Sequence, residues 1–116
     1  MTDHPGAGVT MDWLIEDAIA PDAGLSLARM TVAPGVTSEA HRHPNSTEAI
    51  HVLSGQLLQR NGADWVRLAA GDTILIPAGA IHQTRNTGPE TAVLMVAYSA
   101  GARSYQAACL GTGRYR

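Results

Sequence analysis

The chain has 116 residues, 45% of them apolar, with a formal net charge of −2 and a single cysteine. This length and apolar content suit one domain with one hydrophobic core. The small charge gives no electrostatic reason to expect a nucleic acid or a membrane as a partner, and a single cysteine excludes an internal disulfide.

The N-terminal residues show no sign of a targeting segment, because no basic stretch is followed by a long apolar run. No apolar run approaches the roughly 20 residues that span a bilayer. We therefore expect a cytoplasmic protein. Residues 1–12 are polar and contain glycine, which predicts a loose arm. Residues 11–19 fit either a short amphipathic helix or an early strand.

The middle of the chain predicts many short β-strands. Residues 25–32 alternate apolar and other residues, as a half-buried strand does. Further strands are expected over residues 49–53, 56–59, 65–68, 73–76, 81–85 and 91–98. Asn61 and Gly62 favour a tight hairpin between two of them. This spacing of strands and turns indicates an all-β sandwich or barrel, whereas residues 100–116 lack a strand pattern and are expected to form a tail or a packing arm.

A cluster of two histidines and a glutamate stands between two glycines. The pattern is Gly35-x5-His41-x-His43-x4-Glu48-x6-Gly55. His41 and His43 are two positions apart, so on a strand both side chains point to one face. Imidazole nitrogens together with a carboxylate suit a divalent transition metal. The cluster therefore predicts a metal site.

A second pattern follows, Gly71-x5-Pro77-x-Gly79-x2-His82-x3-Asn86. The two patterns resemble the two conserved motifs of the cupin superfamily, with every fixed position filled by the expected residue. The resemblance implies a double-stranded β-helix, or jelly-roll, barrel. It predicts a single small cupin domain over residues 1–116, with an N-terminal arm at 1–24, a conserved barrel at 25–99 and a C-terminal tail at 100–116.

The resemblance also implies one metal ion, held by the residues at the family's ligand positions. These residues are His41, His43, Glu48 and His82. The donor set suits one divalent transition metal, with Fe(II) or Mn favoured and Zn, Ni, Co or Cu as alternatives. The glycines and Asn86 are expected to be structural. The sequence identifies no catalytic residue beyond the ligands.

Cupins perform varied chemistry, so three functions stay open. The favoured one is an O2-dependent dioxygenase acting on a small oxygenated organic molecule. The second is a redox-neutral isomerase or lyase of a keto-sugar or uronate, in which the ion acts as a Lewis acid. It needs a general base, and the sequence offers none outside the ligands. The third is a non-catalytic cupin that binds a small molecule. We also expect a homodimer, because a small barrel gains by covering its open strand edges.

Several other residues are expected to lie away from the metal. His51 follows Glu48 by three positions, which places it on the opposite face of a strand. Arg29 and Arg60 could hold a carboxylate at a pocket mouth, although solvent exposure is favoured. The scarcity of aromatic residues, with no phenylalanine, predicts an aliphatic pocket. Cys109 is expected to have no chemical role.

Overall fold

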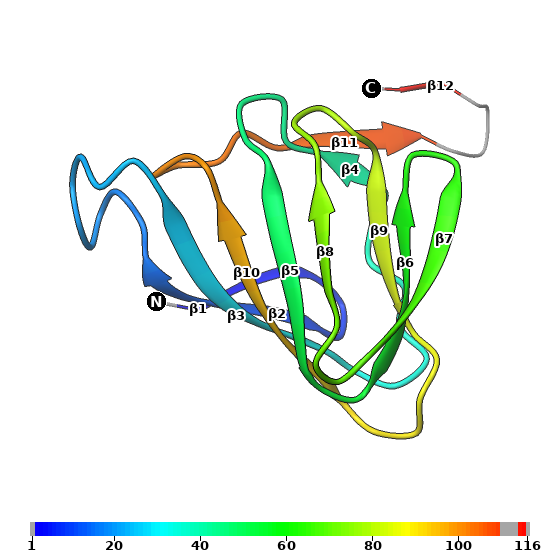
Figure 1. The fold of residues 1–116 in the computed structure, drawn as a ribbon. Helices are drawn as coiled ribbons and strands as arrows, with labels where there is room; N and C mark the ends of the chain where they lie inside the picture. The colour runs from blue at the N-terminus through cyan, green and yellow to red at the C-terminus, as the bar shows by residue number, and fades with distance from the viewer. Residues whose placement is uncertain (1, 110–113, 116) are drawn as a thin grey trace.

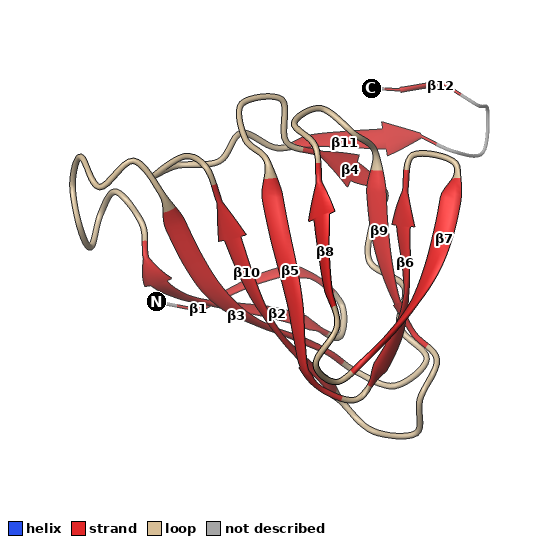
Figure 2. Ribbon diagram, in the orientation of Figure 1, coloured by secondary structure: helices blue, strands red, loops and turns tan. Residues whose placement is uncertain are grey.

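The computed structural model describes residues 2–109 and 114–115, with the side chains of 109, 114 and 115 outside the description. Every regular element in these residues is a strand (Figure 2). The strands are β1 (Thr2–Gly6), β2 (Val9–Ile15), β3 (Ser26–Val32), β4 (His41–Arg42), β5 (Glu48–Ser54), β6 (Gln56–Asn61), β7 (Asp64–Ala69), β8 (Thr73–Ile76), β9 (His82–Asn86), β10 (Ala92–Tyr98), β11 (Gln106–Cys109) and β12 (Arg114–Tyr115). Within the described residues no helix is long and apolar enough to cross a membrane.

The strands form two antiparallel sheets that enclose a barrel (Figure 1). The first sheet has the order β1-β2-β3-β10-β5-β8, and the second has the order β12-β11-β4-β9-β6-β7. Strands that follow one another in sequence often lie in different sheets, which is how the chain winds into a double-stranded β-helix. The predicted jelly-roll barrel is therefore confirmed, and each strand expected between residues 25 and 98 is present.

The expectation of a loose N-terminal arm is wrong. β1 and β2 extend the first sheet, and β2 pairs with β3 from Val9 opposite Val32 to Ile15 opposite Leu27. Val9, Met11 and Trp13 alternate along β2 and are buried in the core. The alternation of apolar residues fits a strand with one buried face, and it decides between the helix and the strand that the sequence left open.

The C-terminal region is also more ordered than a tail. β11 pairs with β4, and residues 99–105, which we call the C-terminal segment, cross the end of the barrel near the predicted metal ligands. The expected hairpin is confirmed, but Asn61 pairs with Asp64, so the two-residue loop is Gly62-Ala63. Gly62 has a φ of 64°, a conformation that glycine adopts without strain. The Cys109 side chain lies outside the described residues.

The core fills the space between the sheets with Val, Leu, Ile and Met side chains, and Asn86 seals one end of it. Asn86 is 1% exposed. Its amide donates hydrogen bonds to the carbonyl oxygens of Val32 at 2.9 Å and Glu90 at 2.7 Å, and its oxygen accepts one from the amide of Gly88 at 2.8 Å. A buried amide with all these partners satisfied stabilises the turn after β9, so its role is structural.

Candidate metal centre

The four predicted ligands meet at one end of the barrel interior. His41 opens β4 and lies opposite His82, the first residue of β9, in the second sheet. Glu48 opens β5 in the first sheet, and His43 follows β4 directly. Ligand nitrogens of the three histidines all lie within 4.8 Å of one another. Sheet pairing thus brings residues from distant parts of the sequence to one point.

Each imidazole is oriented by its Nδ1 nitrogen, which lies within hydrogen-bonding distance of a backbone carbonyl oxygen. The Nδ1···O distances are 2.6 Å from His41 to Glu39, 2.8 Å from His43 to Ser104 and 3.1 Å from His82 to Ala80. A carbonyl oxygen only accepts hydrogen bonds, so Nδ1 carries the proton. In the neutral ring Nε2 then presents its lone pair, which is the form that binds a metal.

Glu48 faces the two buried Nε2 atoms across short distances. Its Oε1 lies 3.2 Å from His43 Nε2 and 2.9 Å from His82 Nε2. None of these three buried atoms has a hydrogen-bond partner among the described residues. A carboxylate oxygen and an unprotonated nitrogen both accept, so their approach is favourable only when a proton or a cation lies between them. The donor set therefore fits a divalent metal ion.

Electrostatics hold two of the donors in their binding form near neutral pH. Burial, followed by the neighbouring His82 ring, lowers the pKa of His41 to about 3. Burial alone would raise the pKa of the Glu48 carboxyl, but the His43 and His82 rings that face it lower it to about 2. His41 is therefore a neutral imidazole and Glu48 a carboxylate, as metal binding requires.

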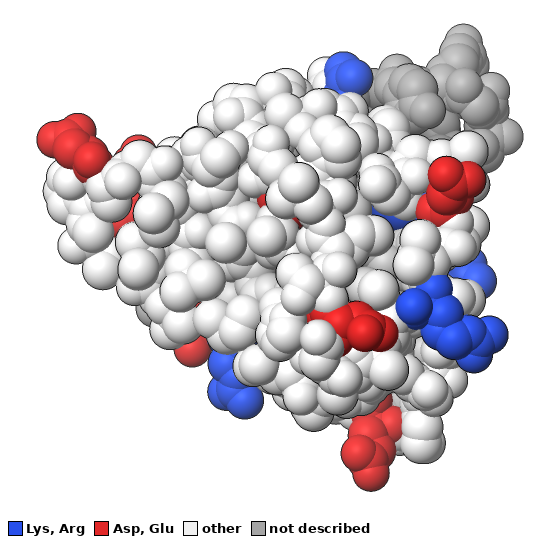
Figure 3. Space-filling view, viewed as in Figure 1, with Lys and Arg blue, Asp and Glu red and all other residues white. Residues whose placement is uncertain are grey.

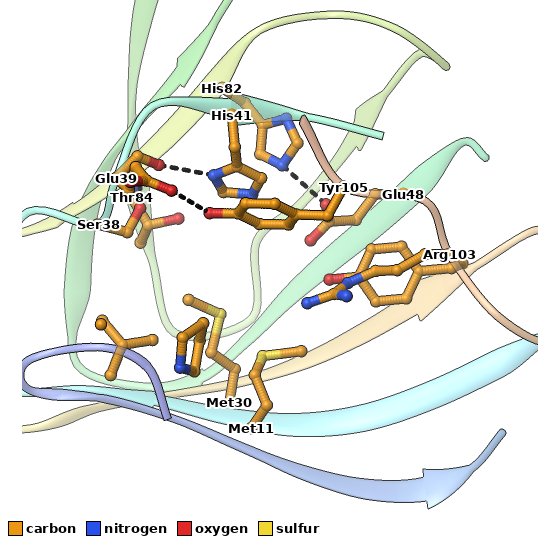
Figure 4. Close-up of a pocket in the computed structure, with 14 residues that line it drawn as sticks. Met11, Met30, Ser38, Glu39, His41, Glu48, His82, Thr84, Arg103 and Tyr105 are labelled. Carbon is orange, nitrogen blue, oxygen red and sulfur yellow. Dashed lines mark hydrogen bonds and ion pairs between the residues drawn. The ribbon is translucent and has the colours of Figure 1, made fainter. Parts of the chain in front are cut away.

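A small cavity, which we call the inner cavity, opens in front of the histidines and Glu48. It encloses about 30 Å³, enough for about two water molecules. Its walls include thioether and hydroxyl side chains from Met11, Met30, Ser38, Thr84 and Tyr98. Figure 4 shows His41, His82 and Glu48 on one side of this space and Met11 with Met30 on the other. A small ligand there would meet polar donors on one side and apolar surface on the other.

A wider space, the outer pocket, adjoins the inner cavity and is open to solvent. It encloses about 390 Å³ and shares Pro5, Glu39, Arg103 and Tyr105 with the inner cavity. Tyr105 stacks on His41 with ring centroids 4.7 Å apart and donates a hydrogen bond of 2.8 Å to Glu39 Oε1. Burial and Glu39 raise the pKa of the Tyr105 hydroxyl, so it stays a protonated donor.

The surroundings of the centre correct one expectation, the aliphatic pocket, and agree with the favoured solvent exposure of Arg29. The pocket is not purely aliphatic, because Tyr98 and Tyr105 line it. Arg29 and Arg60 are not among the residues that line either space, and the pocket arginine is Arg103. Arg103 and Tyr105 lie in a stretch without strand alternation, so periodicity gives no signal for them. The signal in the sequence is compositional, because an arginine and a tyrosine stand two positions apart shortly after the last predicted strand.

The other histidine inside the barrel sequence lies away from the centre, as predicted. His51 is on the outer face of β5, half-buried, with its Nδ1 2.7 Å from the Thr73 hydroxyl on β8. This pairing joins two neighbouring strands. It gives His51 a structural contact at the edge of the first sheet.

Comparison with known proteins agrees with this geometry. The family model described as "Cupin domain" matches residues 28–98. The chain belongs to the cupin family. The match includes all four predicted ligands and ends before the C-terminal segment, so the cupin motifs account for the donors but not for the whole wall of the pocket.

Cupin relatives from plants share the middle of the chain. A rhicadhesin receptor of Pisum sativum is 35% identical over 81 residues, which cover 66% of this chain and 37% of the receptor. Germin-like protein 1-1 of Oryza sativa subsp. japonica is 33% identical over 89 residues, covering 72% of this chain and 41% of that protein. The chain thus spans well under half the length of these relatives.

Solved structures with the same barrel include enzymes of oxalate. A recombinant oxalate oxidase in complex with glycolate is similar with a TM-score of 0.77 and 28% identity, covering 84% of this chain and 54% of the other. An oxalate decarboxylase of Lactobacillus farciminis in a formate complex has a TM-score of 0.81 at 23% identity, covering 92% of this chain and 33% of that one. The second likeness concerns the fold alone.

Proposed function

We propose that this cupin is a metal-dependent oxidoreductase that uses O2 to oxidise a small oxygenated organic molecule. The observation that carries the proposal is the convergence of three imidazoles and one carboxylate beside a small cavity, which His41, Glu48 and His82 line. His41, His43, Glu48 and His82 would hold one divalent ion, with Fe(II) or Mn favoured. Bound there, the ion would supply a Lewis-acidic and redox-active centre with open positions for substrate and O2.

The chain's own residues support this chemistry in two ways. The carbonyl-bound Nδ1 atoms fix the imidazoles in one orientation, so the donors need no rearrangement to receive an ion. Met11 and Met30 line the inner cavity opposite the donors and limit the water that can enter. The similar oxalate oxidase, with glycolate bound, makes small hydroxy acids and oxalate the first compounds to test.

The experiment starts from metal analysis of protein purified without added metal. O2 uptake is then measured with Fe(II)- and Mn(II)-loaded protein on oxalate, glycolate, catechol, a diketone and a thiol, against metal-free protein as the control. We expect uptake that needs both metal and substrate. Labelled 18O2 then separates a dioxygenase, which places label in the product, from an oxidase, which does not. No uptake above the metal-free control with any compound would contradict the proposal.

A second candidate is the redox-neutral isomerase or lyase, and one residue favours it. Glu39 lines both the inner cavity and the outer pocket and is exposed, so it can exchange protons with solvent. It supplies the general base that the sequence pattern did not reveal. Turnover of a keto-sugar or uronate by zinc-loaded protein without O2, lost in Glu39→Gln, would favour this function. Stoichiometric binding with no turnover in either assay would indicate a binding protein.

We also propose that two copies associate through the outer face of the first sheet. Leu27, Ala97, Ala49 and Leu75 are neighbours across β3, β10, β5 and β8. Leu75 is 62% exposed at the edge strand. Figure 3 shows this face largely free of charged side chains, which lie mainly toward its rim. Light scattering should show a dimer that Leu75→Arg converts to a monomer; a monomeric wild-type chain would contradict the proposal.

A further inference from the structure

The C-terminal segment is fixed at the mouth of the metal centre by backbone and side-chain hydrogen bonds. Asn45 donates to the Ala102 carbonyl at 3.0 Å and accepts from the Ser104 amide at 2.7 Å. The Ser104 carbonyl in turn binds His43 Nδ1. Arg103 lies between these two anchored residues, so its backbone position is set by the same contacts that orient a predicted ligand.

Arg103 carries a positive charge that no carboxylate of the described residues neutralises. Carboxylates of Asp3, Glu16, Glu39 and Glu48 line spaces that Arg103 also lines, but Arg103 has no ion pair within 4.0 Å among the described residues. Its Nε is buried without a hydrogen-bond partner there. A guanidinium usually pairs with a planar anion through two of its five N–H groups.

Aromatic rings support the guanidinium instead. Its central carbon lies 5.0 Å from the ring centroid of Trp13, 5.2 Å from that of Tyr98 and 5.5 Å from that of Tyr105. Such cation–π contacts position the cation while leaving its N–H groups available in the ring-free directions. Figure 4 shows the guanidinium beside Glu48 and Tyr105, directed into the space above Met11 and Met30.

We propose that Arg103 binds a carboxylate group of the ligand and so selects small carboxylic acids for this site. Arg103 lines the inner cavity together with His41, Glu48 and His82, so a ligand held by the guanidinium extends toward the predicted metal donors. The inference rests on the proposed function only in calling this ligand a substrate. Arg103 lies beyond the region matched by the cupin model, so the assignment comes from this chain's own C-terminal segment.

The size of the site restricts the acid. The inner cavity of about 30 Å³ leaves room for only a few non-hydrogen atoms next to the donors. A larger acid would have to keep its remaining atoms in the outer pocket, which Glu39 and Tyr105 line. An acid with two or three carbons leaves the fewest atoms to extend into the outer pocket, and glycolate is a suitable probe.

The experiment compares Arg103→Met, which keeps the length of the stem, with Arg103→Lys, which keeps the charge. Arg85→Met is the matched control, because Arg85 also lies over an aromatic ring, Trp65 at 4.8 Å, but is exposed on the outer side of β9. Calorimetry measures the binding of glycolate to Mn(II)-loaded protein. Glycolamide, its uncharged analogue, tests whether any loss of binding is specific to the carboxylate.

We expect Arg103→Met to weaken glycolate binding about tenfold or more, the usual effect of losing a charged hydrogen-bond partner. Arg103→Lys should recover part of this loss, and Arg85→Met should bind like wild type. Glycolamide affinity and Mn content should be unchanged in all variants. The inference is overturned if wild type does not bind glycolate, if Arg103→Met binds it normally, or if glycolamide binding falls equally. Glycolate binding in a protein that shows no O2 uptake with any of the tested compounds would refute the proposed oxidoreductase but leave the Arg103 assignment intact.

Discussion

Along β5 and β9 the inward-facing side chains change in kind from one end of the barrel to the other. Both strands begin at the metal centre, with Glu48 on β5 and His82 on β9. Both end in the sealed half of the core, with Val52 on β5 and Asn86 on β9. The sealed half buries apolar surface or fully bonded amides, which favour folding without any ligand. The site half buries acceptors that face one another, so it gains stability only when a cation binds.

The largest expected effect is the loss of metal binding at the site half, with the sealed half unchanged. His82→Ala should abolish stoichiometric metal binding, because it removes one of three imidazoles and leaves a donor set too small for tight binding. The barrel should still fold, since the sealed half is untouched. Metal analysis and circular dichroism check both points. Retention of one metal per chain in this variant would remove His82 from the ligand set.

The converse substitution acts on the sealed half. Leu94 is 0% exposed at the centre of β10, and Leu94→Ala should lower the free energy of unfolding by about 2–5 kcal/mol through lost burial and a cavity. Metal content of the folded variant should equal that of wild type. Denaturant titration gives the free energy, and metal analysis gives the control. A loss of metal that parallels the loss of stability would show that the two halves are not independent.

Glu48→Gln sharpens the comparison within the site, because it keeps the shape of the side chain and removes its charge. We expect metal affinity to fall by at least the roughly 10–100-fold that loss of an outer-shell partner costs. The free energy of unfolding of the metal-free protein should change less than the metal affinity, because the new amide can donate a hydrogen bond to His43 Nε2 or His82 Nε2, where two acceptors otherwise face each other. Competition with a fluorescent chelator measures the affinity. An unchanged metal affinity would exclude Glu48 as a ligand.

The smallest effect is expected from Asn45→Ala, which touches no donor. The change removes the hydrogen bonds to Ala102 and Ser104, so the carbonyl that orients His43 is held less firmly. Metal affinity should fall by no more than about tenfold, the low end for an outer-shell change. Gln56→Ala, which removes an exposed amide at the start of β6 on the sealed side of the barrel, is the control. A loss of metal affinity as large as that of Glu48→Gln would contradict this expectation. It would indicate that the C-terminal segment is required to hold the predicted ligands in place.

The sequence was sufficient for the barrel and for the meeting of His41, His43, Glu48 and His82, because both depend on short-range spacing. The role of these four residues as metal ligands stays a prediction. Strand patterns identify β3 and β5 to β10, and the two cupin patterns place His41, His43, Glu48 and His82 at positions that sheet pairing then brings together. The sequence of β2 also contains a strand pattern, since Val9, Met11 and Trp13 alternate. The same stretch, however, also fits a short helix.

The remaining wall of the site could not be predicted, for a physical reason. Ser104 orients His43 through its backbone carbonyl, and every residue has one, so no side-chain pattern marks the contact. Arg103 and Tyr105 reach the pocket because Asn45 anchors the segment across the barrel mouth. Such long-range contacts depend on the folded chain rather than on local periodicity.

The way the imidazoles are oriented sets the charge of the loaded centre. Their Nδ1 atoms face neutral carbonyl oxygens of Glu39, Ser104 and Ala80 and not carboxylates, so Glu48 is the single anion among the four donors. A bound dication would keep one unit of uncompensated positive charge in a poorly hydrated space. With the guanidinium of Arg103 nearby, the cavity would attract anions by charge as well as by shape, and a small dianion would balance both centres at once.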